Sequence, residues 1–384
     1  MEFDLNVMKE MEEMRQMFRK FAEAEVEPLA VEIDETHEFP MENVKKMQKL
    51  GYFGIPFPEE LGGEGGSELL YAILVEELAR VCASTSVIVS AHTSLCGGAL
   101  MRFANEEQKE KYLRPLASGE KLGAFGLTEP NAGTDASGQQ TVAVKDGDEY
   151  ILNGTKIFIT NAGAADTFIV FAMTDRSKGT HGISAFIVEK GTPGFDIGTV
   201  EKKMGIHASS TCELIFRDCR IPAENLLGKE GRGFPIAMQT LDGGRIGIAA
   251  QALGIAQGAF DRTVQYVKER EQFGRPLAKF QNTQFMLAKM ATEIEASRLL
   301  VYKAAIAHDT QDRFSEEAAM AKLKASRTAM WVTTECVQLH GGYGYIQEYQ
   351  VERMMRDAKI TEIYEGTSEV MEMVIGGSVL ARAK

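Results

Sequence analysis

The spacing of hydrophobic and polar residues divides the chain into a helical part, a strand-rich part and a second helical part. Apolar residues recur at three- and four-residue intervals over residues 7–31, which predicts a helix with one buried face. Between residues 123 and about 222, apolar and polar positions alternate, as they do in half-buried strands. Helical spacing returns after residue 233. The pattern predicts an N-terminal helical domain over 1–121, a middle β domain over 122–230 and a C-terminal helical bundle over 231–384.

The strand-rich part predicts a small antiparallel β domain with a barrel-like or sandwich arrangement. Two dipeptides, Asp146-Gly147 and Asn153-Gly154, separate the first three strand patterns, and both are strong signals for tight hairpins. The predicted strands are Thr141–Val144, Tyr150–Leu152, Lys156–Thr160, Thr167–Met173, Ile183–Val188 and Glu213–Ile221.

The C-terminal part predicts long helices joined by short links, which is typical of an antiparallel bundle. A serine followed by two acidic residues predicts that Ser315 is the N-cap of one of these helices. The chain is therefore expected to be mostly α with an inserted antiparallel β domain. The predicted long helices are Phe234–Arg270, Gln284–His308 and Ser315–Leu339, and a shorter one follows Glu365.

Composition narrows the classes of function. The chain has 384 residues and a net charge of −13, which argues against a nucleic-acid backbone as partner. Its five cysteines form no CxxC pair, so we expect neither a disulfide framework nor a metal site, and a reducing cytoplasm fits best. The acidic N-terminus lacks the basic region of a signal peptide. No apolar run approaches the roughly 20 residues that a membrane span needs.

One carboxylate, that of Glu365, lies in a stretch where it could be aimed at a ligand. The stretch Ile360–Glu369 carries Glu365 immediately before Gly-Thr-Ser, which predicts a chain break and then a helix N-cap. Burial against apolar groups raises the pKa of such a carboxyl group, and a nearby helix N-terminus lowers it. A poised general base could result. For a single Glu, a solvated turn residue is the simpler alternative.

Two stretches beside the predicted strands could face a ligand. Gly126–Asp135 is rich in small residues and hydroxyls, so its N–H groups could bind an anionic or ring-shaped ligand, or it could be an ordinary turn. In Phe158–Asn161 an aromatic residue beside a threonine ends a strand. Phe158 could pack on a flat cofactor, although a core phenylalanine is the commoner case.

Three stretches of the C-terminal part interrupt the helical pattern with glycines. Adjacent glycines in Leu241–Arg245 cost about 1 kcal/mol each relative to Ala, so either something approaches the backbone closely or the helix breaks. Its Asp242 and Arg245 would share a helix face, as an ion pair or as a ligand-binding corner. Arg270 could meet a phosphate or complement a helix C-terminus. The glycines of Gln338–Gly344 would let a ligand touch the main chain, or would form a C-cap.

Taken in order, these stretches resemble the acyl-CoA dehydrogenases, a family of FAD flavoproteins. The likeness spans essentially the whole chain and is closest to short-chain members, especially bacterial butyryl-CoA dehydrogenases. It implies a helical domain, a β domain and a four-helix bundle, assembled as a homotetramer with the flavin near a subunit interface. The resemblance rests on Leu127–Asp135, Lys156–Asn161, Leu241–Arg245, Arg270–Pro276, Gln338–Gly344 and Ile363–Glu369.

The resemblance also implies an activity: dehydrogenation of a short-chain acyl-CoA to a trans-2-enoyl-CoA, with Glu365 as base and an electron-transferring flavoprotein as redox partner. The flavin ring and its linker are assigned to Phe125, Leu127, Thr128, Phe158, Ile159 and Thr160, with Thr134 near both phosphate and substrate. The pyrophosphate and adenosine end is assigned, partly from a neighbouring subunit, to Arg270, Phe273, Gln281, Gln338, Leu339, His340, Gly341 and Gly342, completed by Thr367 and Glu369. The substrate is assigned to Thr134, Asp242, Arg245 and Gly366.

The chain departs from parts of the family pattern. Many relatives have Trp where Phe158 stands, and some branched- and long-chain relatives carry the base at the position of Gly244. Residues 82–94 contain no Arg or Lys, which disfavours the dicarboxylate substrate of glutaryl-CoA relatives. The alternatives are an acyl-CoA oxidase, an aryl-propenoyl-CoA reductase in an electron-bifurcating complex and a flavin-free CoA-binding assembly subunit. Acyl chain length and direction of reaction stay open.

Overall fold

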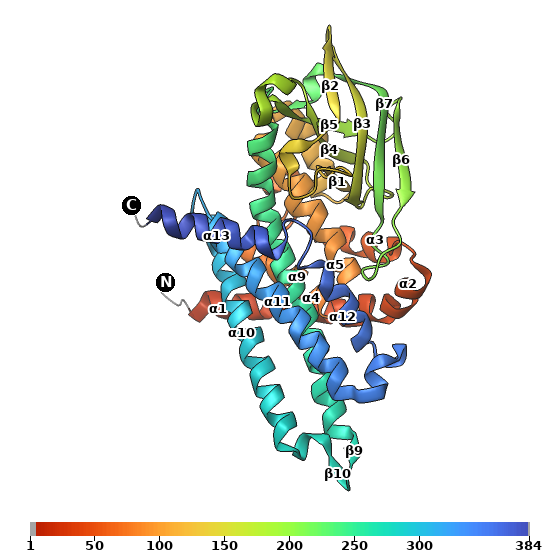
Figure 1. Ribbon diagram of the computed structural model, residues 1–384, viewed down its shortest axis with the longest axis vertical. Helices are drawn as coiled ribbons and strands as arrows, with labels where there is room; N and C mark the ends of the chain where they lie inside the picture. Colours follow the sequence, from red (N-terminus) through yellow and green to blue (C-terminus); the bar gives the residue numbers. More distant parts are fainter. Residues whose placement is uncertain (1–4, 383–384) are drawn as a thin grey trace.

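A computed structural model describes residues 5–382, and Figure 1 shows helices at both ends of the chain around a β sheet. The N-terminal part is helical, as predicted, and it includes π-helical turns at Ala22–Val26 and Ala91–Gly97. Among residues 5–382, no helix is both long enough and apolar enough to cross a membrane. The N-terminal helices are α1 (Leu5–Phe21), α2 (Ala30–Thr36), α3 (Met41–Lys49), α4 (Glu68–Ala79), α5 (Ala83–Ser90), α6 (Gly98–Phe103), α7 (Glu106–Gln108) and α8 (Arg114–Ala117).

The middle part forms one sheet in the order β6-β7-β3-β2-β4-β5-β8, with β1 paired to β4. Most of its pairs are antiparallel, as predicted, but β1 and β2 each run parallel to β4. A parallel pair needs a long connection, and the β2–β3 hairpin lies within the one between β1 and β4. The strands are β1 (Gly123–Gly126), β2 (Val142–Asp146), β3 (Glu149–Thr160), β4 (Thr167–Met173), β5 (Ile183–Glu189), β6 (Phe195–Val200), β7 (Thr211–Pro222) and β8 (Leu226–Leu227).

The second predicted hairpin, at Asn153-Gly154, is wrong. β3 runs through it without a turn, and its register against β7 shifts between Leu152 and Gly154, as at a β-bulge. A side chain at Gly154 would collide with Thr141, because the built Cβ lies 2.4 Å from the Thr141 Oγ1 atom. The glycine therefore permits a close approach of strands rather than a reversal of the chain.

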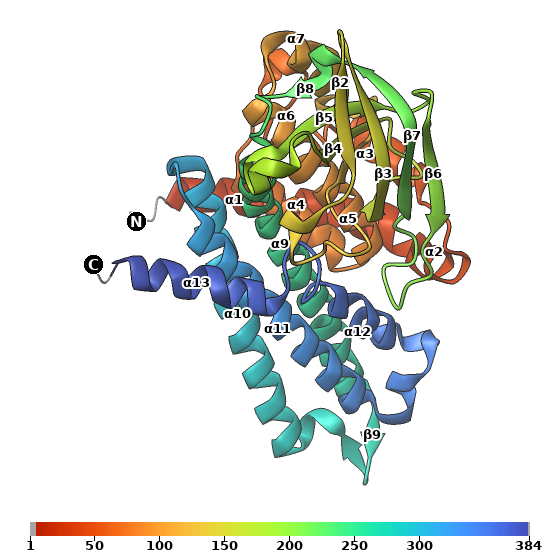
Figure 2. The same cartoon turned by 45° about the horizontal axis from the view of Figure 1, so that its top comes forward.

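The C-terminal part begins with the 37-residue helix α9 (Gly233–Glu269), which runs antiparallel to α10 (Gln281–Thr310). The hairpin of β9 (Glu271–Gln272) and β10 (Arg275–Pro276) lies at the opposite end of these helices from the sheet (Figures 1 and 2). The remaining helices are α11 (Ser315–His340), α12 (Val351–Ile360) and α13 (Ser368–Arg382).

The predicted capping role of Ser315 is wrong. The N-cap residue of α11 is Phe314, which makes no side-chain cap, and the Ser315 hydroxyl instead donates a hydrogen bond to the Asp242 carboxylate of α9. The Ser315 hydroxyl thus bonds Asp242, which is distant in sequence, rather than the N–H groups of its own helix that the sequence pattern predicts.

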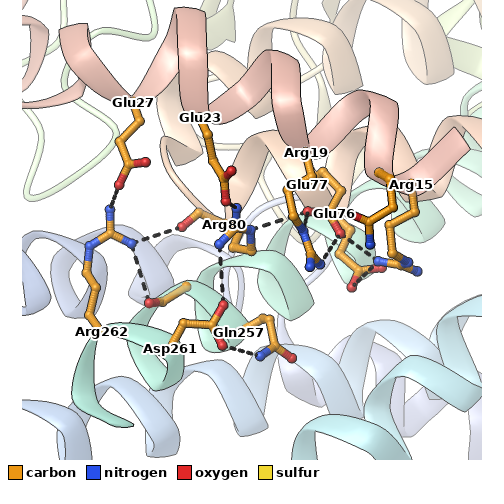
Figure 3. Close-up of polar contacts among 12 residues, drawn as sticks. Arg15, Arg19, Glu23, Glu27, Glu76, Glu77, Arg80, Gln257, Asp261 and Arg262 are labelled. Atoms are coloured by element: carbon orange, nitrogen blue, oxygen red, sulfur yellow. Dashed lines mark hydrogen bonds and ion pairs between the residues drawn. The ribbon is translucent and has the colours of Figure 1, made fainter. Parts of the chain in front are cut away.

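A buried ion-pair network joins α1, α4 and α9 (Figure 3). At its centre the fully buried Glu77 carboxylate accepts hydrogen bonds from Arg15 Nη1 at 2.7 Å, Arg19 Nε at 2.9 Å and Arg80 Nε at 3.3 Å. Burial by itself raises the pKa of Glu77, but the hydrogen bonds and charges of these arginines outweigh burial, and the pKa lies below its usual value. Arg80 continues the network to Asp261 of α9. The network ties the first helix to the bundle.

Candidate functional site

Glu365 lies on the segment between α12 and α13, with an unusual backbone. Its φ is +54° and that of Gly366 is +106°, so both residues are in the left-handed half of conformational space. For a glutamate this conformation is strained, and such strain persists only where surrounding contacts hold it. Two buried cations provide those contacts, since Arg245 Nε donates to the Glu365 carbonyl at 3.3 Å and Lys322 Nζ donates to the Gly366 carbonyl.

The Glu365 carboxyl group is aimed inward. Its Oε2 atom is buried and has no hydrogen-bond partner among the side chains and main chain that the structure describes. Burial raises the pKa of Glu365 to about 7, and the charges of Lys322 and Arg245 pull that pKa downward. A free buried acceptor with a pKa near neutrality is the state that general-base catalysis needs. The solvated-turn alternative does not describe this side chain.

The glycine pair of α9 is explained by the same carboxylate. The helix continues through Gly243 and Gly244 without a break. A Cβ built on Gly244 would lie 2.1 Å from Glu365 Oε2, whereas one on Gly243 has no atom within 4 Å. The close approach to the backbone is therefore at Gly244. Asp242 and Arg245 do form an ion pair, at 2.6 Å, and Arg245 also reaches the Glu365 loop.

The residues assigned to the flavin ring divide into buried and accessible members. Phe125, Leu127 and Ile159 are buried in the core. The accessible members are Thr128 and Thr160, which are half-buried, and Thr134 and Phe158, which are exposed. Phe158 is 58% exposed because β3 is irregular between Lys156 and Ile159 and Phe158 has a φ of +59°. The core-phenylalanine alternative is therefore wrong.

The sequence analysis did not identify the residues that hold the Gly126–Asp135 loop to the sheet. The fully buried Lys156 ammonium donates to the Leu127 carbonyl at 3.1 Å, to Gln139 Oε1 at 3.1 Å and to Glu129 Oε1 at 2.8 Å. Its charge lowers the pKa of Glu129 in spite of burial. A buried lysine ammonium needs a hydrogen-bonded or charged partner. A lysine at an inward-facing position of a predicted strand is therefore the sequence feature from which this pairing could have been predicted.

Six of the residues assigned to the adenosine end line one cavity at the far end of the bundle. A cavity of about 410 Å³ is lined by Arg270, Gln338, Leu339, His340, Gly341 and Gly342, together with Tyr266 and Tyr343, which sequence reasoning missed. His340 is also structural, because its Nδ1 hydrogen-bonds the Cys336 carbonyl at 2.7 Å and its ring stacks on Tyr266.

This end fits one half of a dinucleotide. The Arg270 guanidinium lies over the Tyr343 ring at 5.1 Å and pairs with no carboxylate among the described residues, so it is free to meet a phosphate. The main chain at Gly341 and Gly342 is open, with no atom within 4 Å of a built Cβ. Phe273 is 94% exposed at the tip of the β9–β10 hairpin, and Gln281, the first residue of α10, is exposed.

One chain does not bring the two halves together. The sheet that carries Phe158 and the hairpin that carries Phe273 lie at opposite ends of the molecule (Figures 1 and 2). Thr367 and Glu369 lie at the start of α13, beside Glu365, where the Thr367 hydroxyl accepts from the Val370 N–H.

Among the described residues, no group of three His, Cys, Asp or Glu side chains could hold a metal ion.

Comparison with known proteins gives consistent matches over the chain. Its sequence matches the acyl-CoA dehydrogenase N-terminal domain at residues 8–120, the middle domain at 124–219 and the C-terminal domain at 231–380. A short-chain specific acyl-CoA dehydrogenase of Clostridium acetobutylicum is 64% identical over 98% of this chain and 99% of its own.

Two solved structures are similar throughout. The butyryl-CoA dehydrogenase of Megasphaera elsdenii has a TM-score of 0.96 and 55% identity, and the match covers 99% of this chain and 100% of that one. A chain in an Acidaminococcus fermentans structure, described as an electron transferring flavoprotein studied for flavin-based electron bifurcation, has a TM-score of 0.97 and 57% identity over 98% and 100% of the two chains.

Proposed function

The chain belongs to the acyl-CoA dehydrogenase family, and from that premise we propose that it dehydrogenates a short-chain acyl-CoA, butyryl-CoA first, with Glu365 as the base. It is an oxidoreductase that uses FAD. The observation that carries the proposal is the buried, unpartnered Oε2 of Glu365, held by a strained loop against the α9 backbone. The similarity to short-chain relatives supports the substrate class.

The chemistry follows from what this carboxylate can do. Glu365 Oε2 takes the proton from Cα of the thioester, and a C=C bond forms between Cα and Cβ as hydrogen leaves Cβ with its electron pair. Bound FAD supplies the acceptor for that hydride, and the product is a trans-2-enoyl-CoA. Holding Glu365 beside Cα replaces an unfavourable encounter with a fixed geometry. The burial that raises its pKa to about 7 keeps it basic enough to accept a weakly acidic proton.

The binding roles are proposed on the same basis. The accessible hydroxyls and ring near β3 suit the flavin end of FAD, and the Arg270 cavity suits its phosphate and adenosine end. Asp242 and Arg245 form an ion pair, and Arg245 contacts the Glu365 carbonyl next to Gly366, so these three residues are proposed to contact the substrate. For the buried Phe125, Leu127 and Ile159 we propose that they contribute to the flavin site through their main-chain atoms or through side-chain packing.

A homotetramer is supported by two features of the bundle. A groove of about 830 Å³ runs between α10, α11 and α13, lined by Leu300, Trp331 and Ile375 among others. Exposed apolar side chains flank it, including Phe285 and Met373. The five buried free thiols support a cytoplasmic location.

Replacing Glu365 with Gln tests the proposal. The variant keeps size and hydrogen bonding but cannot accept a proton, so we expect wild-type FAD content and flavin reduction slowed by at least about 100-fold. The measurement is anaerobic bleaching of the flavin by butyryl-, octanoyl- and 3-phenylpropionyl-CoA, which also compares the acyl groups that the site accepts. Bleaching of Glu365→Gln at the wild-type rate would remove the base assignment.

A second candidate is the reverse reaction in an electron-bifurcating complex. It is favoured by the similarity to a chain of the Acidaminococcus structure, which also supports an electron-transferring flavoprotein as partner. Mixing the protein with such a flavoprotein, NADH, crotonyl-CoA and a low-potential one-electron acceptor separates the two directions. Formation of butyryl-CoA coupled to reduction of a second acceptor supports the reductase, and its absence supports the dehydrogenase.

A further inference from the structure

Lys322 is a buried ammonium group close to the site, and neither the motifs nor the family likeness pointed to it. It lies on α11, and its relative exposure is 0%. Its Nζ donates a hydrogen bond of 2.5 Å to the carbonyl oxygen of Gly366, the residue after Glu365. A charged ammonium is expensive to bury unless it is paired, so its presence needs a reason.

Among the residues whose burial the structure describes, Lys156 is also a fully buried lysine, and its pairing differs from that of Lys322. Lys156 forms an ion pair with Glu129 at 2.8 Å. Lys322 has no carboxylate within 4 Å among the side chains that the structure describes. The strongest charge acting on it is the Glu365 carboxylate, which favours its charged form, and Glu365 Oε2 is itself unpartnered. The two buried groups therefore interact through their charges without a direct hydrogen bond between them.

The other charged groups around Lys322 are engaged elsewhere. From α9, Arg245 carries the same positive charge, which lowers the pKa of Lys322, and it pairs with Asp242 at 2.6 Å. From the loop after α12, Glu362 pairs with Lys359 at 2.6 Å. From α13, Glu369 is exposed to solvent. Burial lowers the pKa of Lys322 to about 8, so it is still mostly charged at neutral pH.

We propose that Lys322 is a positioning residue for proton transfer: it fixes the left-handed Glu365–Gly366 turn through the Gly366 carbonyl and keeps a positive charge beside the Glu365 carboxylate. Together with Arg245 on the Glu365 carbonyl, it holds two successive carbonyl groups of the loop. The carboxyl group is then aimed inward, and its ionised form is favoured although no described residue donates a hydrogen bond to Oε2. This role rests on the proposed function of Glu365.

Three substitutions separate the parts of this role. Lys322→Met removes the donor and the charge, Lys322→Gln keeps a shorter donor without charge, and Lys322→Arg keeps both. Lys303→Met, on the exposed surface of α10, is the control for loss of a lysine. Each variant is first compared with wild type in FAD content, oligomeric state and melting temperature.

The charge is tested by pH profiles. Because the Lys322 charge lowers the pKa of Glu365, its removal raises that pKa, and the acidic limb of kcat/KM should move up by roughly one pH unit in Lys322→Met and Lys322→Gln. Lys322→Arg and Lys303→Met should keep the wild-type limb. An infrared titration without substrate, following the carboxyl band that disappears in Glu365→Gln, should show the same displacement.

The positioning role predicts a fall in kcat of about 10- to 100-fold for Lys322→Met, with KM changed less than about threefold. A wild-type acidic limb and infrared titration in both uncharged variants would overturn the proposal, even if they were less stable. If Lys322→Met does not fold, Lys322→Gln and Lys322→Arg decide between the outcomes. Full activity of Glu365→Gln would instead overturn the base assignment, so the two failures are distinguishable.

Discussion

A single methyl group added at Gly244 tests the placement of Glu365, the proposed base, more sharply than removal of the Glu365 carboxylate does. Gly244 faces the Glu365 side chain from α9, and a Cβ there would lie 2.1 Å from Oε2 and 2.6 Å from Leu95 Cδ2. The next residue toward the N-terminus, Gly243, has no atom within 4 Å of its built Cβ. The helix thus offers two adjacent glycines, of which one touches the carboxylate and the other touches nothing.

The size of the effect follows from the overlap. Carbon and oxygen atoms are in ordinary contact at about 3.4 Å, so the carboxylate in Gly244→Ala must retreat by roughly 1 Å. A misplacement of that size costs about 100-fold in rate. The Gly243→Ala control should keep its rate and gain about 0.5–1 kcal/mol of stability, because alanine is the better helix former.

The assay is the rate of anaerobic flavin reduction by butyryl-CoA, with FAD content and melting temperature measured on both variants. We expect Gly244→Ala to bind FAD and to react about 100-fold more slowly, while Gly243→Ala reacts at the wild-type rate. A Gly244→Ala enzyme with an unchanged rate would show that Glu365 does not act from the position described. Equal losses in both variants would point to a general effect on the helix instead.

Three further predictions concern stability, pH and cofactor binding. Glu77→Gln should cost about 1–3 kcal/mol in urea unfolding at pH 7, because Arg19 loses the carboxylate that it hydrogen-bonds and Arg15 keeps only Glu76 and Glu12 as charged partners. As the folded-state pKa of Glu77 is lowered, its contribution is present above the unfolded pKa of about 4.3 and is lost as pH falls through the folded value, so the deficit should shrink in acid. The kcat/KM of the wild type should fall about tenfold per pH unit below about pH 7, because Glu365 must be ionised; a flat profile from pH 5 to 7 would contradict this. Arg270→Ala should weaken FAD binding by about 10- to 100-fold in equilibrium dialysis, with an unchanged melting temperature of the FAD-free protein.

Much of the fold and of the site follows from local pattern. The change from helical to alternating spacing and back reflects which faces are buried, and it predicts the α–β–α order and the three long helices from about residue 233 to 340. Glu365, Asp242 and Arg245 stood out because a glycine or a helix start beside a charge is visible in a short stretch of sequence.

The remaining features depend on contacts between distant segments. Asn153-Gly154 reads as a hairpin locally, but the approach of Thr141 makes it a bulge. Ser315 reads as a cap, but Asp242 takes its hydroxyl. The parallel pairing of β1 with β4 also depends on segments 40 residues apart or more.

The pKa of Glu365 also depends on contacts between segments that are distant in sequence. Neighbours in sequence specify a turn before a helix, but the pKa of about 7 arises from burial and from Lys322 and Arg245, which are 43 and 120 residues away along the chain. Local sequence sets backbone propensities and amphipathic faces, whose energies depend on adjacent residues. The polarity around one carboxylate depends on which helices pack over it, and only the assembled tertiary structure decides that.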